Sequence, residues 1–294
     1  MSEIIITVFT PTYNRAYMID KLYDSLCRQT CKDFEWIVVD DGSVDNTEEL
    51  IQNFIQENKI HIVYYKQKNQ GKHIAINKGV ELAKGELFFI VDSDDILPKD
   101  SLEIVIEKYQ SIKDDETIAG LAGRRGYISG GYIGTNKTYD DVIMTSIDFR
   151  FKKKIAGDMA EVYKTKVIRQ YPFPQFEGER FCPEALVWKR IDQQYKMLWF
   201  SDIIYEGEYI PDGLTANIFK VRKNSPKASC LYYAEEAQYG TPAYQKIKSV
   251  ANYWRFSIYD NISFWEKLQK VSLSKSIIAL PVIAALIIKD KNRG

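Results

Sequence analysis

Short apolar runs alternate with helix-type patterns through residues 1–110 of this 294-residue chain. The runs at 4–10 and 35–39 are rich in β-branched residues and lack polar alternation, as expected of parallel strands buried on both faces. We predict further strands at 60–65, 87–91 and 117–123, and helices at 17–30, 45–55, 72–84 and 99–109. Such alternation requires crossover connections, and it therefore predicts a mostly parallel sheet.

Acidic clusters directly follow two of the predicted strands. Asp40 and Asp41 follow the run at 35–39, and Asp92-Ser93-Asp94-Asp95 follows the run at 87–91. Ligands of parallel sheets lie beyond the carboxyl ends of the strands. Carboxylates gathered there repel one another, and Mg²⁺ or Mn²⁺ is the simplest compensation. Taken alone, an Asp-rich turn is more often a plain turn than a metal site, so its context decides.

Composition excludes several classes of protein. Lys and Arg number 40, as do Asp and Glu, so the net charge is zero and a nucleic-acid binder is not expected. Four scattered cysteines are too few for a disulfide scaffold. The amino terminus has no basic region followed by an apolar core, so we expect no signal peptide and a cytoplasmic location.

Four motifs occur in order along residues 1–110. They are Phe9-Thr10-Pro11-Thr12-Tyr13-Asn14-Arg15, Asp40-Asp41-Gly42-Ser43, Asn69-x-Gly71 with the later Asn77, Gly79 and Ala83, and Asp92-x-Asp94-Asp95. The ordered set resembles family-2 glycosyltransferases. That resemblance implies an α/β GT-A fold, with a Rossmann-like, mostly parallel sheet flanked by helices. It also implies transfer of a monosaccharide from a nucleotide-sugar, usually UDP-linked, with inversion and with Mg²⁺ or Mn²⁺ bound.

The resemblance also implies roles for individual residues. Asp94 is the expected metal ligand, with Asp92 on the ribose or on metal-bound water. Asp41 would accept a hydrogen bond from the imide N–H of the base, which only an unprotonated carboxylate can do. The nucleotide-sugar site would further include Thr10, Pro11, Thr12, Tyr13 (near the uracil), Gly71, Lys72 and Ser93.

An inverting transfer needs a base that deprotonates the acceptor hydroxyl. In the family this is a carboxylate that follows the Asp-x-Asp motif by roughly 80–100 residues at the start of a helix. We assign it to Glu184, because Pro183 suits the first turn of a helix predicted at 183–195. Glu179 and Glu177 are held in reserve, and Glu184 could instead be a mere helix-terminal charge. Asp158 is the candidate acceptor-binding residue.

Other polar and small residues have structural interpretations. We expect Asn14 and Asp45 to cap helices, Gly42 and Gly71 to form turns, and Gly79 to pack helix on sheet. Asp95 is expected to be a structural acceptor at the turn before Pro98. An aromatic platform for a sugar is possible from Trp188, Trp199, Tyr205 and Tyr209, but half or more of these should lie in the core.

The carboxyl-terminal part contains an uncharged run at 277–288, interrupted by Pro281. Basic residues flank it: Lys267, Lys270 and Lys275 before it, and Lys289, Lys291 and Arg293 after it. The run is shorter than the roughly 20 residues that cross a bilayer. It predicts either a shallow membrane contact with a basic rim or a helix packed on protein.

We therefore expect a catalytic domain at 1–210, with a nucleotide-sugar-binding half at 1–110 and an acceptor-binding half at 111–210. A helical extension would occupy 211–294. The natural acceptor would be a lipid-linked saccharide of cell-surface polysaccharide synthesis, at the inner face of the membrane. Two alternatives remain. The first is a nucleotidyltransferase, but such an enzyme normally has a glycine-rich loop after its first strand, and residues 10–15 contain no glycine. The second is a catalytically silent nucleotide-binding scaffold.

Overall fold

The computed structural model describes residues 4–208 and 217–291. The chain divides into two compact units, Met1–Pro172 with Arg190–Tyr209, and Phe173–Lys189 with Ile210–Gly294. Residues 173–189, which we expected in the acceptor-binding half, group with the carboxyl-terminal helices by their contacts. The catalytic-domain boundary at 210 stays a prediction.

The first unit is built on one eight-stranded sheet with the order β3-β2-β1-β4-β7-β5-β8-β6. The strands are β1 (Ile6–Thr12), β2 (Phe34–Asp40), β3 (Ile62–Lys66), β4 (Leu87–Ile90), β5 (Ile118–Tyr127), β6 (Val142–Met144), β7 (Met159–Lys164) and β8 (Lys196–Gly207). Pairing is parallel among β3, β2, β1 and β4 and between β5 and β8, whereas β7 and β6 run antiparallel to their neighbours. The mostly parallel sheet is confirmed.

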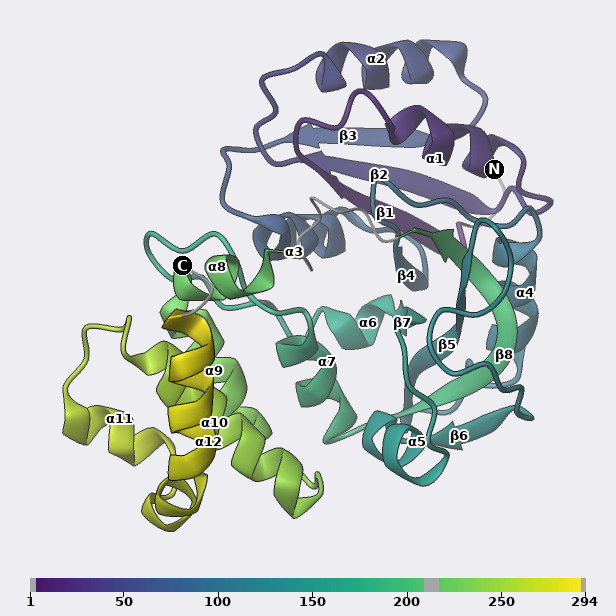
Figure 1. Cartoon of the computed structure of the whole chain (residues 1–294). Coiled ribbons are helices and arrows are strands. Elements are labelled where there is room, and N and C mark those ends of the chain that lie inside the picture. The colour runs from purple at the N-terminus through teal and green to yellow at the C-terminus, as the bar shows by residue number, and fades with distance from the viewer. Residues whose placement is uncertain (1–3, 209–216, 292–294) are drawn as a thin grey trace. The chain divides into compact units, whose positions relative to one another are not determined.

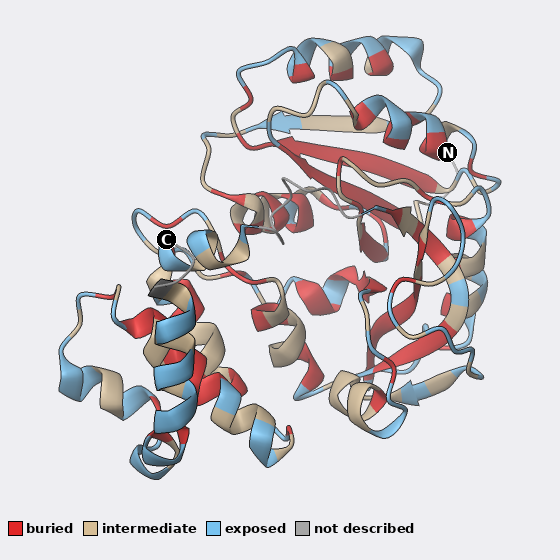
Figure 2. Cartoon of the chain, in the orientation of Figure 1, coloured by how far each residue is buried: buried red, intermediate tan, exposed pale blue. Residues whose placement is uncertain are grey.

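Helices cover both faces of the sheet (Figure 1). Ile6 and Val8 of β1 share a core with α1 (Ile19–Cys27), α2 (Thr47–Glu57) and α4 (Ser101–Gln110). Phe9 points to the opposite face, where α3 (Lys72–Leu82) packs so closely that a Cβ on Gly79 would lie 2.2 Å from the Phe9 ring. The packing role expected for Gly79 is confirmed. Burial on both faces makes β1 and β2 continuous buried strands (Figure 2).

The remainder of the first unit contains two short helices that the sequence did not predict. They are α5 (Ser146–Lys152) and α6 (Thr165–Ile168). Thr145 caps α5, and Asp192 accepts hydrogen bonds from the backbone N–H groups of Ser146 and Ile147 at its start. At α5 the stabilising groups are thus a local cap and one distant carboxylate, and neither produces the long apolar periodicity from which a helix is normally predicted.

The second unit is helical, as predicted for the extension. It contains α8 (Ile218–Lys223), α9 (Pro226–Glu236), α10 (Ala243–Ser257), α11 (Phe264–Lys270) and α12 (Leu273–Lys291), and α7 (Ala185–Asp192) begins in it. Its core joins α9, α10 and α12 through Tyr253, Phe256 and Ala279. Within the described residues, no single helix is long and apolar enough to cross a membrane. The pair α11 and α12, taken together, passes that test, with a bend of 104° between the two helices.

Candidate active site

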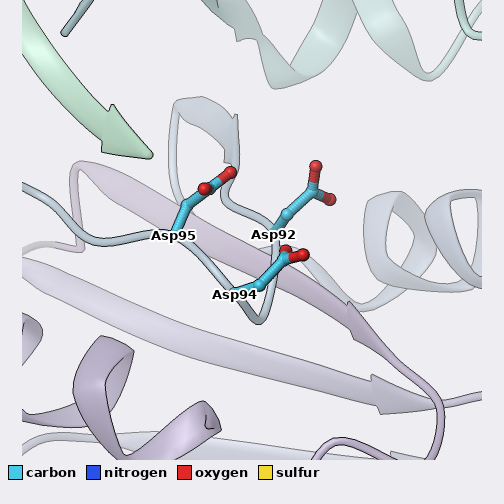
Figure 3. Close-up of side chains that lie close together, drawn as sticks. All are labelled: Asp92, Asp94 and Asp95. Atoms are coloured by element: carbon cyan, nitrogen blue, oxygen red, sulfur yellow. The ribbon is translucent and has the colours of Figure 1, made fainter. Parts of the chain in front are cut away.

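Three carboxylates converge on the loop that follows β4. Asp92, Asp94 and Asp95 each offer an oxygen, and these oxygens lie within 4.8 Å of one another (Figure 3). All three side chains are half-buried. An all-oxygen donor set of this size suits a hard divalent cation such as Mg²⁺ or Mn²⁺. The structure thus brings together the predicted ligands Asp94 and Asp92, and it adds Asp95.

Strand β8 holds this acidic loop in place. The Ile96 N–H donates to the Glu206 carbonyl and the Glu206 N–H donates to the Ile96 carbonyl, both at 2.9 Å. The Tyr205 hydroxyl donates to Asp95 Oδ2 at 2.5 Å and accepts from the Asp92 backbone N–H at 3.1 Å. Gly207 leaves room for Asp95, since a Cβ there would lie 2.1 Å from Asp95 Oδ1. Asp95 is therefore the structural acceptor that we expected as well as a candidate ligand.

Charge is unevenly shared within the cluster. Burial tends to raise the pKa of Asp92, but Lys72, at 2.6 Å from its Oδ1, and Arg125 outweigh burial and leave that pKa lowered. Burial and the Asp92 charge raise the pKa of Asp94, and they raise that of Asp95 to about 7. A second positive charge near Asp94 and Asp95 would relieve this repulsion, so the residues fit a bound divalent cation.

Arg125 was missed by the sequence analysis. Its Nε donates to the Met159 carbonyl at 3.1 Å, and its guanidinium lies 4.0 Å from the centre of the Tyr205 ring. It thus supports Tyr205 while placing a positive charge beside Asp92 and Asp95. No local signal marked it, because the strand predicted at 117–123 ends before Arg125, whereas β5 continues to Tyr127.

Asp41 organises the loop that leads into α3. Its Oδ1 accepts from Gln67 Nε2 and from the Gln70 N–H, and its Oδ2 accepts from the Gly71 N–H, each at 2.8 Å. These bonds leave lone-pair capacity on Oδ2, so the base contact predicted for Asp41 stays a prediction. Gly71 adopts φ 98° and Gly42 φ 86°, which confirms both as turn glycines.

The end of β1 contributes buried and exposed groups. The Thr10 hydroxyl accepts from the Trp36 indole N–H at 2.9 Å, and Pro11 is buried. Thr12 Oγ1 is buried with no hydrogen-bond partner among the described residues. Tyr13 is 46% exposed. The pocket roles of these residues remain predictions.

The two expected helix caps have different outcomes. Asn14 does not cap α1, because its Oδ1 accepts from the Val44 N–H, which ties the loop after β1 to the loop after β2. Its φ of 52° is a left-handed conformation that asparagine tolerates better than most residues. Asp45 acts as expected at the start of α2, since its Oδ1 accepts from the N–H and the hydroxyl of Thr47.

The remaining predicted residues lie in separate places. Ser93 is buried within the acidic loop. Asp158 precedes β7 and lies within electrostatic range of Glu161, a carboxyl whose pKa is raised by burial. Glu184 is half-buried at the start of α7 in the second unit. Nothing in the structure tests its role as base.

Glu179, the reserve base, has a structural partner. Its Oε1 accepts from the Lys227 N–H at 2.7 Å and its Oε2 from the Ala228 N–H at 2.9 Å, in the first turn of α9. Both carboxylate oxygens are thus used at the amino terminus of a helix, where the dipole favours a negative charge. Of the four aromatic residues, Trp199 and Tyr205 are buried, Trp188 is half-buried, and Tyr209 lies outside the described residues.

Comparison with known proteins gives a consistent result. The family model described as "Glycosyl transferase family 2" matches residues 7–164. Glycosyltransferase GlyG of Streptococcus pneumoniae is 36% identical over 121 residues, which cover 41% of this chain and 39% of that protein. The GalNAc(5)-diNAcBac-PP-undecaprenol beta-1,3-glucosyltransferase of Campylobacter jejuni is 29% identical over 185 residues, 62% of this chain and 58% of that protein. The matched region therefore spans only part of each relative.

Solved structures resemble the chain over nearly its whole length. S. aureus TarS 1–349 in complex with UDP-GlcNAc matches with a TM-score of 0.65 and 19% identity, covering 95% of this chain and 80% of that one. Mannosyltransferase PcManGT from Pyrobaculum calidifontis, in complex with GDP-Man and Mn²⁺, matches with a TM-score of 0.58 and 18% identity, covering 98% and 81%. At these identities the likeness concerns the fold.

Proposed function

The chain belongs to glycosyl transferase family 2, whose model matches more than half of it, and we propose that it transfers a monosaccharide from a UDP-sugar to a saccharide hydroxyl. Its sheet and helices have the GT-A arrangement expected from the motifs. The observation that carries the proposal is the carboxylate cluster Asp92, Asp94 and Asp95, placed at the carboxyl end of β4 and held there by Tyr205.

The donor site is proposed along the carboxyl ends of β1, β2 and β4. Register places Thr12 beside Asp40, and the Asp41 N–H donates to the Thr12 carbonyl at 2.8 Å, so the first two motifs lie together. Asp41 then connects to Gly71, and Lys72 connects to Asp92, so all four motifs form one continuous polar edge. TarS structures with UDP and UDP-GlcNAc support a uridine nucleotide, as does the resemblance of the motifs.

A divalent cation fits the carboxylate cluster. Asp94, Asp95 and Asp92 would hold Mg²⁺ or Mn²⁺, which when bound supplies positive charge for the departing diphosphate. Lys72 is placed to share that work, because its ammonium group already lies beside the Asp92 carboxylate. Tyr205 and Arg125 orient the ligands. The Mn²⁺ in the PcManGT structure supports this proposal.

Inversion requires direct displacement by the acceptor hydroxyl, with a base on the side away from the leaving phosphate. We assign the base to Glu184, because Glu179 is engaged with the α9 backbone. The name of the C. jejuni relative, which specifies an undecaprenol-linked saccharide, supports a lipid-linked acceptor in cell-surface polysaccharide synthesis. Asp158 is proposed to contact that acceptor, at the inner face of the membrane.

Calorimetric titration with UDP, GDP, CDP and ADP tests the donor proposal, first with Mn²⁺ and then with EDTA. We expect binding that is selective for UDP and is lost with EDTA, followed by turnover of a UDP-sugar. Selective binding of GDP would indicate that the donor is a GDP-sugar and not a UDP-sugar. Turnover of a nucleoside triphosphate with a sugar phosphate would indicate a nucleotidyltransferase, and nucleotide binding without turnover would indicate a silent scaffold.

A further inference from the structure

Helix α12 is apolar on more than one side, and only one side is packed. Trp254 Nε1 of α10 donates to Ser276 Oγ at 2.9 Å, Ala279 is fully buried, and the Arg255 guanidinium pairs with Asp290. These α12 residues, at 276, 279 and 290, lie on one side of the helix and fix it to α10. This side of α12 therefore makes the apolar contacts with the rest of the second unit.

A second apolar stripe on α12 is exposed. Leu273, Ile277, Leu280 and Ile288 recur at spacings that place them on one side of the helix, and they are 57, 58, 57 and 61% exposed. Figure 2 shows much of this helix in the colour of exposed residues. Helix α11 adds Phe264 and Trp265, which are 58 and 72% exposed. We call these six residues the open face. Exposed apolar side chains gathered on two successive helices of one unit indicate an interaction site.

The charges around the open face are mostly positive. Of the two acidic residues in α11 and α12, Glu266 forms a capping box with Ser263, and Asp290 pairs with Arg255. Lys270 and Lys289 are exposed, and Lys267 is half-buried. The chain as a whole has no net charge, so this local excess of lysine is a property of the segment. It is complementary to a negatively charged partner.

We propose that the open face docks on the surface of an anionic lipid bilayer, with α12 lying in the interfacial plane. Apolar side chains would enter the acyl boundary, the lysines would contact phosphate groups, and Trp265 would occupy the headgroup level. The uncharged run at 277–288 rises only about 18 Å as a helix, which is too short for a core of about 30 Å. A second copy of the chain is less suitable, because Ile278 and Val282, 62 and 37% exposed, make the apolar surface wider than a coiled-coil seam.

Co-sedimentation of the full chain with vesicles tests the proposal. We expect binding to phosphatidylcholine vesicles that contain phosphatidylglycerol, weak binding to phosphatidylcholine alone, and release at high salt. The double variant Ile277→Asn/Leu280→Asn should bind at least about tenfold more weakly, because two large side chains no longer enter the apolar layer. The matched control is Val44→Asn/Ile128→Asn, which changes two exposed aliphatic residues of the first unit and should bind like the wild type.

A second measurement leaves the apolar stripe of α12 intact. Trp265 is exposed, so the fluorescence of the wild type should shift to shorter wavelength on anionic vesicles, and Trp265→Phe should lose that shift. Equal binding of the double variant and the control, with wild-type melting temperatures, would overturn the proposal. A wild-type dimer in sedimentation velocity that the double variant converts to monomer would overturn it in favour of self-association. UDP titration is independent of the open face, so failure of the donor proposal remains distinguishable.

Discussion

Tyr205 and Asp95 are 110 positions apart, yet the Tyr205 hydroxyl donates to Asp95 Oδ2 at 2.5 Å. The Tyr205 hydroxyl oxygen also accepts a hydrogen bond from the Asp92 backbone N–H, so one phenol fixes both a side chain and the backbone of the acidic loop. Tyr205 is fully buried, and Arg125 stacks on its ring. Strand β8 therefore determines the shape of a loop that belongs to β4, and with it the positions of the three carboxylates.

Tyr205→Phe should weaken Mn²⁺ binding about 10- to 100-fold, because residues that orient metal ligands typically contribute that much. Titration of Mn²⁺ against UDP binding measures this. The control is Tyr109→Phe, which removes a bond of the same kind, from Tyr109 to Glu86 Oε2 at 2.7 Å, away from the cluster. Unchanged Mn²⁺ affinity in Tyr205→Phe would show that the loop keeps its shape without the phenol.

Asp41→Asn should lower the free energy of unfolding by about 1–3 kcal/mol, because an amide presents only one oxygen to three donors and leaves a buried N–H unpaired. UDP affinity should fall as well, since the loop at 67–71 leads into the donor site. Urea denaturation and UDP titration measure the two effects. Asp24→Asn is the control, because this aspartate is exposed on α1 and its side chain accepts no hydrogen bond among the described residues. Equal losses in both variants would contradict the special role of Asp41.

The donor half was predictable because its signals are local. Buried strands, amphipathic helices and acidic turns each fit within a few residues, and parallel topology then places strand ends together. Even there one boundary was wrong, because the β-branched run ends at Thr10, whereas β1 continues through Pro11 to Thr12. The Phe9 carbonyl accepts from the Val91 N–H, so the backbone groups of Phe9 face β4. Those of Pro11 face the same way, but the pairing of β1 with β4 ends at Phe9. The N–H that proline lacks is therefore not needed for pairing.

The acceptor half was less predictable because its contacts are distant in sequence. Lys164 is a buried lysine whose ammonium group donates to the carbonyls of Ile112, Lys113 and Asp115, about 50 positions away. Gly134 and Gly157 approach so closely that a Cβ on Gly134 would lie 2.2 Å from the Ala156 carbonyl oxygen. These contacts join residues that become neighbours only in the folded chain, so no local periodicity of the sequence indicates them.

Burial of His73 should make stability depend on pH. Burial lowers its pKa to about 4 against an ordinary value of 6.5, although the Asp41 charge acts in the opposite direction. The unfolded chain therefore binds a proton between these values that the folded chain does not. The stability that comes from keeping His73 neutral is complete above pH 6.5 and is lost as the pH falls towards 4. The free energy of unfolding should fall by up to about 3 kcal/mol over that range.

Urea denaturation between pH 7 and pH 4 measures this dependence. His73→Gln should lose less stability over that range than the wild type does. His61→Gln is the control, because it changes the only other histidine, which is exposed. Equal slopes in His73→Gln and His61→Gln would contradict the prediction.

Two carboxamide variants test the proposal that Glu184 is the base and that Glu179 only caps a helix in the second unit. Glu184→Gln should lower kcat about 10²- to 10⁴-fold while UDP affinity and melting temperature stay at wild-type values, because a base acts on the acceptor hydroxyl and not on the donor. Glu179→Gln should instead destabilise the fold by about 1–3 kcal/mol, since one oxygen replaces the two that accept from Lys227 and Ala228. Its kcat should remain within a few-fold of wild type at temperatures where it is folded. A large loss of kcat in Glu179→Gln, with Glu184→Gln still active, would transfer the role of base to Glu179. Loss of UDP binding in Glu184→Gln would place that side chain in the donor site instead.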